Sequence, residues 1–279
     1  MGEKNGAVAF FDVDGTLVWH DFERLRARAK EGATSEALQI RPSEAVYEAF
    51  SRMRAAGNLT FICTGRHLPF IPQAIRELNP DGFVAGAGAL VCVGDEVVRA
   101  EFIERDLLLE TARRFVAAGI DITLEGDEDN IELHPSGRPA RFPGSRLART
   151  AEEVAELSRE RRYSKFCSNG VGERDLVPLR DFIDAHYTIC DLQGGVLEFS
   201  MRGVDKGTGI EAALAHLGHG REGTFAFGDS ENDLSMRAAV ETFVAMGNAL
   251  PNVRAVADYV TLTAAEDGVP AALEHFGLI

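Results

Sequence analysis

The chain has 279 residues, of which 45% are hydrophobic, and a formal net charge of -15. These values are typical of a folded globular protein with one large or two ordinary domains, and they exclude a disordered chain. The excess of acidic residues opposes binding to nucleic acid or to an anionic membrane surface. A small phosphorylated ligand is also anionic, so a site for one calls for a local metal cation.

The cysteines and the first residues bear on the cellular compartment. Cys63, Cys92, Cys167 and Cys190 lie far apart and form no Cys-x-x-Cys pair, so we expect reduced thiols. The first apolar run is too short to span a membrane, and acidic residues interrupt it where a signal peptide would continue. We therefore expect a cytoplasmic protein that is a monomer or a homodimer.

The first strand ends in two acidic residues. Residues 7–11 form a continuous apolar run that predicts a buried strand, and Asp12 and Asp14 follow it. Side chains two residues apart in an extended chain point the same way, so both carboxylates can face one small volume. Two anions there repel each other unless a cation or a shared proton relieves them. Taken alone, the segment also fits an ordinary strand with an Asp-Gly turn.

The segment after Trp19, with basic residues at 24–30, fits an exposed amphipathic helix.

The next elements alternate between helix and strand, which predicts a parallel sheet covered on both faces. We expect a helix at 43–57 with Ser43 as its cap, a strand at 59–63, a helix at 69–78 and a short strand at 82–84.

From residue 85 the pattern changes to hairpins and isolated helices, which are typical of an antiparallel α+β unit. We expect a hairpin at 89–99, helices at 106–118, 151–161 and 177–185, strands at 121–124 and 165–168, a connector at 135–144 and a hairpin at 187–199.

The alternating pattern then returns, with helices at 206–217, 233–239, after Pro251 and at 269–276, and strands at 224–227, 241–245 and 258–261. We therefore predict a doubly wound, Rossmann-like parallel α/β core formed by residues 1–84 and 195–279. Residues 85–194 are predicted to form an inserted α+β cap domain.

Polar groups follow three predicted core strands. Besides Asp12 and Asp14, these are Thr64 with Gly65, and Asp229 with Asn232 and Asp233. Ligands of doubly wound sheets bind at the carboxyl ends of the strands, so these groups can converge. Lys206 opens a helix, whose positive end favours an anion. Each group alone also fits an ordinary turn, helix cap or solvated lysine.

The order Asp-x-Asp-Gly-Thr, Thr-Gly-Arg, a lysine opening a helix, and Gly-Asp-x-x-Asn-Asp resembles the haloacid dehalogenase superfamily of phosphohydrolases. The segments 228–236, 246–249 and 266–269 narrow the resemblance to its Cof-type, sugar-phosphatase-like group, and the place of the insert fits that group's type-two cap. One departure is Ala87-Gly88-Ala89, where Cof-type members commonly have Asn-Gly-Ala. The departure bears on substrate specificity and leaves the four motifs untouched.

The resemblance implies a Mg²⁺-dependent phosphatase acting on monoesters of small metabolites, such as sugar phosphates. Asp12 would attack phosphorus and form an aspartyl-phosphate, and Asp14 would act as acid and then base. Thr64, the Gly65 N–H, Lys206 and Asn232 would hold the substrate or its phosphoryl group.

The implied Mg²⁺ ligands are Asp12, Asp229 and the backbone carbonyl of Asp14, with Asp233 binding through water or supporting the other ligands. Arg66 fits either a role in the site or an ion pair at its edge.

Several functions stay open at this point. A phosphomutase, a nucleotide or cofactor phosphatase, and a non-catalytic phosphometabolite-binding regulator are the alternatives. The presence of both Asp12 and Asp14 favours an enzyme. Cap candidates for contact with the leaving group are Glu125, Asp127, His134, Arg138 and Asn169, each of which also fits an exposed loop residue.

Overall fold

A computed structural model describes residues 6–19, 41–142, 144–172, 174–192 and 195–279. The amphipathic helix predicted after Trp19 lies outside these residues. Within them, none of the helices has the length and apolar character needed to cross a membrane.

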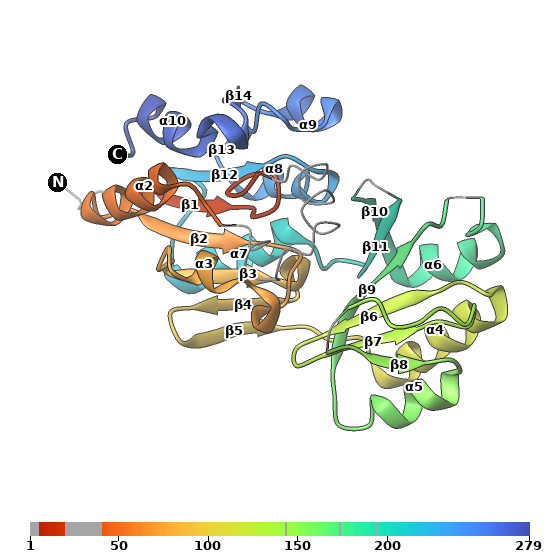
Figure 1. The fold of residues 1–279 in the computed structure, drawn as a ribbon. Coiled ribbons are helices and arrows are strands. Elements are labelled where there is room, and N and C mark those ends of the chain that lie inside the picture. The colour runs from red at the N-terminus through yellow and green to blue at the C-terminus, as the bar shows by residue number, and fades with distance from the viewer. Residues whose placement is uncertain (1–5, 20–40, 143, 173, 193–194) are drawn as a thin grey trace, which may run out of the picture.

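The larger of two sheets has eight strands, with β1 (Val8–Phe11) in its interior (Figure 1). All four residues of β1 are buried, as expected for a parallel strand covered on both faces. The strand order is β14 (Tyr259–Val260), β13 (Thr242–Ala245), β12 (Thr224–Gly228), β1, β2 (Leu59–Cys63), β3 (Gly82–Ala85), β4 (Leu90–Val93) and β5 (Glu96–Ala100). The strands from β14 to β3 run parallel to one another. The pairs β3–β4 and β4–β5 are antiparallel.

Helices cover both faces of this sheet. On one face, Phe11 of β1 packs against Phe50 of α2 (Glu44–Ala55), with ring centroids 4.9 Å apart. On the other face, α7 (Lys206–Leu217) packs against β3, where Gly209 approaches Val84 closely. The remaining core helices within the described residues are α3 (Gln73–Arg76), α8 (Met236–Ala239), α9 (Pro251–Val256) and α10 (Gly268–His275). The predicted doubly wound α/β core is confirmed.

The smaller sheet has six strands and forms the cap (Figure 1). Its order is β10 (Tyr187–Asp191), β11 (Val196–Met201), β9 (Tyr163–Asn169), β6 (Ile122–Gly126), β7 (Asn130–Leu133) and β8 (Arg146–Ala148). Its helices are α4 (Arg105–Ala118), α5 (Ala151–Leu157) and α6 (Arg180–His186). Except for the parallel pair β7–β8, neighbouring strands are antiparallel, as the α+β pattern predicted.

The two faces of the cap sheet differ in chemistry. One face packs against the helices through aromatic residues, including Phe115 of α4 and the stacked rings of Phe166 and Phe199. Because side chains alternate along a strand, Lys165 and Glu198, which neighbour these phenylalanines in sequence, point to the opposite face. That face is therefore polar although it is buried.

The sheets suggest domain boundaries that differ from the predicted ones. The hairpin β4–β5 pairs with β3 and so extends the core sheet, whereas β11 pairs with β9 in the cap sheet. The sequence pattern predicted β4 and β5 in the cap because hairpins are typical of antiparallel sheets. In the structure, this hairpin forms an antiparallel edge of the otherwise parallel core sheet. We propose that the cap extends from about residue 101 to about residue 202.

Several elements also differ in extent from their predictions. The predicted helix at 69–78 is a 3₁₀ turn at Leu68–Phe70 followed by the single turn α3. The predicted helix at 233–239 is a 3₁₀ turn at Glu231–Asp233 followed by α8. Strands β7 and β8 were not predicted. In each case the apolar run is too short to determine the element by its periodicity.

Gly88 allows the turn between β3 and β4 to approach the start of α7. Its φ is +96°, and an added Cβ would lie 1.9 Å from the carbonyl oxygen of Asp205. This contact places Lys206, the next residue, against the end of the core sheet.

We therefore expect Gly88→Ala to destabilise the protein by about 3 kcal/mol or more, because it combines backbone strain with overlap. Gly94→Ala is the matched control, since Gly94 also has positive φ (+55°) but has no neighbouring atom within 4 Å of an added Cβ. It should cost only about 1 kcal/mol. Urea unfolding of both variants measures the difference, and equal losses would refute this role of Gly88.

Candidate functional site

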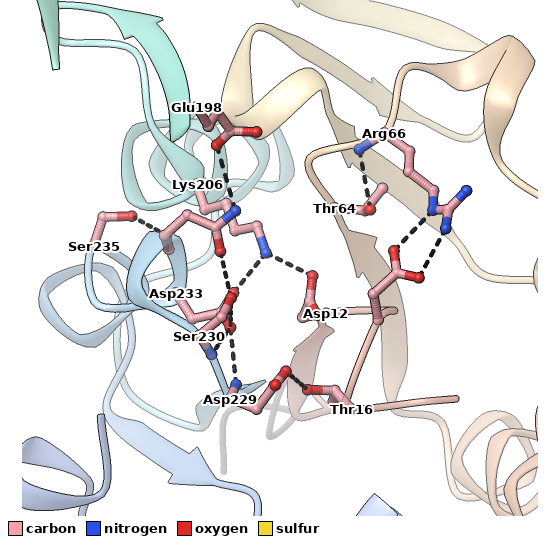
Figure 2. A network of polar contacts seen from close by, with 12 residues as sticks. Asp12, Thr16, Thr64, Arg66, Glu198, Lys206, Asp229, Ser230, Asp233 and Ser235 are labelled. Atoms are coloured by element: carbon pink, nitrogen blue, oxygen red, sulfur yellow. Dashed lines mark hydrogen bonds and ion pairs between the residues drawn. The ribbon is translucent and has the colours of Figure 1, made fainter. Parts of the chain in front are cut away.

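The predicted site residues of the core lie at the carboxyl edge of the parallel strands. Asp12 follows β1, Thr64 follows β2 and Asp229 follows β12, and these three strands are neighbours in the sheet. Figure 2 shows the side chains of this edge together with Lys206 and Asp233. The topology thus brings together residues that are up to about two hundred positions apart in sequence.

Lys206 is the buried centre of this group. Its Nζ donates to Asp12 Oδ1 at 2.6 Å and to Asp233 Oδ1 at 2.5 Å, and its side chain is only 1% exposed (Figure 2). Asp205 caps α7 by accepting from the backbone N–H of Thr208, which fixes the first turn that carries Lys206. Burial alone would lower the pKa of Lys206, but Asp12 and Asp233 raise it well above its ordinary value. Lys206 is therefore a fixed cation.

Asp229 lies on the other side of Asp12 and Asp233. Its Oδ1 accepts from Thr16 Oγ1 at 3.1 Å. Gly15 leaves room for this carboxylate, because an added Cβ there would lie 2.2 Å from Asp229 Oδ2. Asn248, from one of the segments noted in the sequence, donates to the Gly15 carbonyl at 2.8 Å and so holds the same loop.

Asp12, Asp229 and Asp233 offer oxygens that fit a hard divalent cation. One carboxylate oxygen from each lies within 4.8 Å of the others, the only such cluster of three possible metal ligands within the described residues. Carboxylate oxygens are the protein ligands that Mg²⁺ prefers. Asp233 is also engaged by the protein, since its Oδ2 accepts from the backbone N–H groups of Asp229 and Ser230 at 2.8 and 2.9 Å.

Without a metal, this cluster retains protons. Burial raises the pKa of Asp12 to about 7, opposed by Lys206 and reinforced by Asp233 and Asp14. Burial likewise raises the pKa of Asp229 to about 8, and the charges of Asp12 and Asp233 add to the shift. A bound cation would favour the ionised form of both groups. The cluster is therefore arranged for a positive charge in addition to that of Lys206.

Asp14 is held by Arg66, whose role the sequence left open. Arg66 Nε and Nη2 donate to the two carboxylate oxygens of Asp14, each at 2.8 Å. This two-pronged ion pair fixes the orientation of the carboxylate. Arg66 thus acts on a predicted site residue, and both side chains are 38% exposed.

Thr64 and Gly65 follow β2, and Asn232 lies close to Gly65, since a Cβ added at Gly65 would lie 3.8 Å from Asn232 Nδ2. Thr64 is buried, and its Oγ1 accepts from the backbone N–H of Arg66 at 3.2 Å. Asn232 accepts from Ser230 at 2.9 Å and donates to Glu198 Oε1 at 3.4 Å. In Figure 2, Thr64 and Lys206 lie on opposite sides of Asp12.

The polar face of the cap adds a cluster that the sequence analysis largely missed. Lys165 Nζ donates to Glu125 Oε2 at 2.7 Å and to Glu198 Oε2 at 2.8 Å. Glu125 had been proposed, but Lys165 and Glu198 had not. A lysine and a glutamate inside otherwise apolar strands, Lys165 before Phe166 and Glu198 between Leu197 and Phe199, were the available signal.

A histidine of the core also contacts the cap. His67 Nε2 lies 3.0 Å from Ser164 Oγ, and both residues are buried. Burial lowers the pKa of His67 to about 4, so the ring is neutral at physiological pH. This contact joins the loop after Gly65 to strand β9.

The other proposed cap residues lie elsewhere. His134, Arg138 and Asn169 line a separate pocket of about 300 Å³, which shares no lining residue with the pocket beside Lys206. Asp127 forms an ion pair with Arg162 at 2.7 Å. The structure therefore brings only Glu125 of these candidates close to Arg66 and Lys165.

Comparison with known proteins agrees with this geometry. A family model described as haloacid dehalogenase-like hydrolase matches residues 9–273. The protein YkrA of Bacillus subtilis, named as a candidate phosphatase, is 24% identical over 287 residues, with 97% of each chain covered.

Solved structures share the fold over nearly the whole chain. The sugar phosphatase BT4131, of subclass IIB of the HAD superfamily, is 25% identical with a TM-score of 0.77, covering 98% of this chain and 100% of that one. BT1666 from Bacteroides thetaiotaomicron is 22% identical with a TM-score of 0.81, covering 100% and 97%. The predicted superfamily, Cof-type group, fold class and phosphatase class of enzyme are confirmed. The chain belongs to the haloacid dehalogenase-like hydrolases.

Proposed function

We propose that this protein is a Mg²⁺-dependent phosphatase that hydrolyses phosphate monoesters of small metabolites through an aspartyl-phosphate. The observation that carries the proposal is the buried contact of Lys206 with Asp12 and Asp233 beside Asp229. This arrangement provides a nucleophilic carboxylate, a fixed cation for the phosphoryl group and oxygen ligands for a metal. The name of the related sugar phosphatase supports sugar phosphates or similar esters as substrates.

In the first step, an oxygen of Asp12 forms a bond to phosphorus while the bond to the leaving oxygen breaks. Asp14 donates a proton to that oxygen, which leaves as an alcohol. Lys206, Thr64 and the Gly65 N–H hold the other phosphoryl oxygens, and their fixed positions stabilise the charge of the transition state.

In the second step, water attacks phosphorus, Asp14 accepts a proton from the water, and the bond to Asp12 breaks. Phosphate leaves, and both carboxyl groups return to their initial states. The ion pair with Arg66 orients Asp14 for the step in which it is a base, and it must loosen when Asp14 carries the proton.

The residues that would hold Mg²⁺ are Asp12, Asp229 and the backbone carbonyl of Asp14, with Asp233 orienting the Asp229 loop. When bound, the metal supplies positive charge that screens Asp12 from the incoming phosphate and stabilises charge during transfer.

Asp12→Asn tests the nucleophile. An amide cannot form the acyl-phosphate, so we expect kcat for an aryl phosphate to fall at least about a thousandfold. The fold should persist, because the substitution keeps the size of the side chain. Steady-state hydrolysis and thermal unfolding of the same preparation measure both quantities. Turnover near the wild-type rate by a folded variant would rule out Asp12 as nucleophile.

Asp14→Asn separates the two steps. An aryl leaving group needs little protonation, so the variant should still transfer phosphate to Asp12 but hydrolyse the product slowly. We expect a burst of about one nitrophenol per enzyme, followed by a steady rate at least about a hundredfold below wild type. Rapid-mixing absorbance measures the burst, and an unchanged steady rate would contradict a role for Asp14 as base.

The pKa shifts of Asp12 and Asp229 predict the pH dependence of stability without metal. Both pKa values are raised from 3.8 in the folded protein, to about 7 and about 8, so the folded state binds more protons than the unfolded chain. These groups therefore lower the free energy of unfolding as pH rises from about 4 to 8. Asp229→Asn should weaken this dependence.

Added Mg²⁺ should oppose the same loss. At one hundred times its dissociation constant, a ligand of the folded state stabilises by about 2.7 kcal/mol. Thermal unfolding at pH 5 and pH 8, with chelator or with Mg²⁺, measures both effects. Equal stabilisation of the wild type and Asp229→Asn by Mg²⁺ would contradict the proposed ligand set.

A further inference from the structure

A small pocket between core and cap lies directly beside Lys206. It encloses about 100 Å³, and its lining includes Lys206, Asn232, Thr188 and Ser200 together with three acidic residues, Glu198, Asp205 and Glu231. Since small-molecule pockets usually measure roughly 300–1,000 Å³, this one suits a short group. Its position next to the proposed phosphoryl site is where the remainder of a phosphate ester would extend.

Three cations of the described residues lie near this pocket, and each is already engaged by carboxylates. Lys206 contacts Asp12 and Asp233, and it is the only cation of the described residues that lines the pocket. Lys165, on the adjoining cap face, is shared between Glu125 and Glu198. Arg66 is held by Asp14. A second anion on the substrate would therefore meet carboxylates without a cation of its own.

Glu198 is the carboxylate best placed to contact the leaving group of the substrate. Its side chain is only 2% exposed and reaches from β11 of the cap to the core, where Oε1 accepts from Asn232 at 3.4 Å. A methyl group added at Gly65 would lie 3.1 Å from Glu198 Oε2. Glu198 thus approaches two segments that are proposed to hold the phosphoryl group.

Buried carboxylates discriminate strongly between substituents. A hydroxyl or ammonium group can donate hydrogen bonds to them, whereas an anion is repelled in a site from which water is largely excluded. The hydroxyl groups of Thr188 and Ser200 add further polar contacts for a polyol.

We propose that this pocket selects esters whose leaving group is neutral or cationic and carries hydroxyl or amino donors, and that Glu198 excludes leaving groups with a second anion. This inference rests on the proposed phosphatase function. It narrows the substrates to small polyol or amino-alcohol monoesters and excludes phosphorylated carboxylic acids and bisphosphates.

Two three-carbon esters provide a matched test. Glycerol 3-phosphate and 3-phosphoglycerate differ in one terminal group, a hydroxymethyl in the first and a carboxylate in the second. We expect kcat/KM of the wild type, with Mg²⁺ at fixed ionic strength, to favour glycerol 3-phosphate by at least about tenfold. In Glu198→Gln, which removes the charge but keeps the shape, this ratio should fall at least about threefold. A wild-type ratio near one, or an unchanged ratio in Glu198→Gln, would overturn the inference.

Three controls separate this outcome from failure of the proposed function. Glu222→Gln removes an equal charge from an exposed residue just before β12, at the opposite edge of the sheet, and should keep the wild-type ratio. Hydrolysis of an aryl phosphate by the wild type reports on phosphatase activity alone. Calorimetric binding of the two esters to Asp12→Asn, with and without Glu198→Gln, reports on the pocket even if neither ester is hydrolysed. Tighter binding of 3-phosphoglycerate would refute the selection.

Discussion

The close approach of three carboxylates around a single ammonium group is the constraint on which the rest of this structure depends. Asp12, Asp229 and Asp233 converge beside Lys206, where Asp12 and Asp233 are buried and Asp229 is half-buried. One lysine cannot balance three anions, so the free protein retains protons, as the raised pKa values of Asp12 and Asp229 indicate. A divalent cation removes the same imbalance. In the proposed mechanism, the electrostatic cost of these carboxylates without a cation is the source of the affinity for a metal, and then for a phosphoryl group.

The fold holds these charged side chains together because the elements that carry them meet at one edge of the sheet. Parallel strands bring Asp12 and Asp229 to one edge of the sheet, and the crossover through the cap returns the chain so that α7 starts at the same edge. The cap then covers the edge with a polar sheet face, from which Glu198 reaches Asn232. In the proposed mechanism the core provides the chemistry, and the cap provides a charged surface that would select the leaving group.

The sequence predicted the core well because its signals are local. A buried strand followed by Asp12 and Asp14, or a helix opened by Lys206, can be recognised without tertiary information. The cap residues Lys165 and Glu198 could not be assigned in this way, because their importance arises from pairing across β9, β6 and β11. The hairpin β4–β5 was assigned to the cap for the same reason, since its partner β3 is only known from the sheet. Similarly, the sequence left the role of Arg66 open, and the structure shows its ion pair with Asp14 at 2.8 Å.

The central claim is that Asp12 accepts the phosphoryl group during turnover. The most direct measurement is acid quenching of the wild-type enzyme within milliseconds of mixing with substrate and Mg²⁺, followed by peptide mass spectrometry. The account predicts one phosphoryl group on the peptide that contains Asp12, located to that residue by fragmentation and lost as turnover ends. A phosphoryl group on another residue, or rapid turnover with no phosphorylated peptide at any quench time, would contradict it.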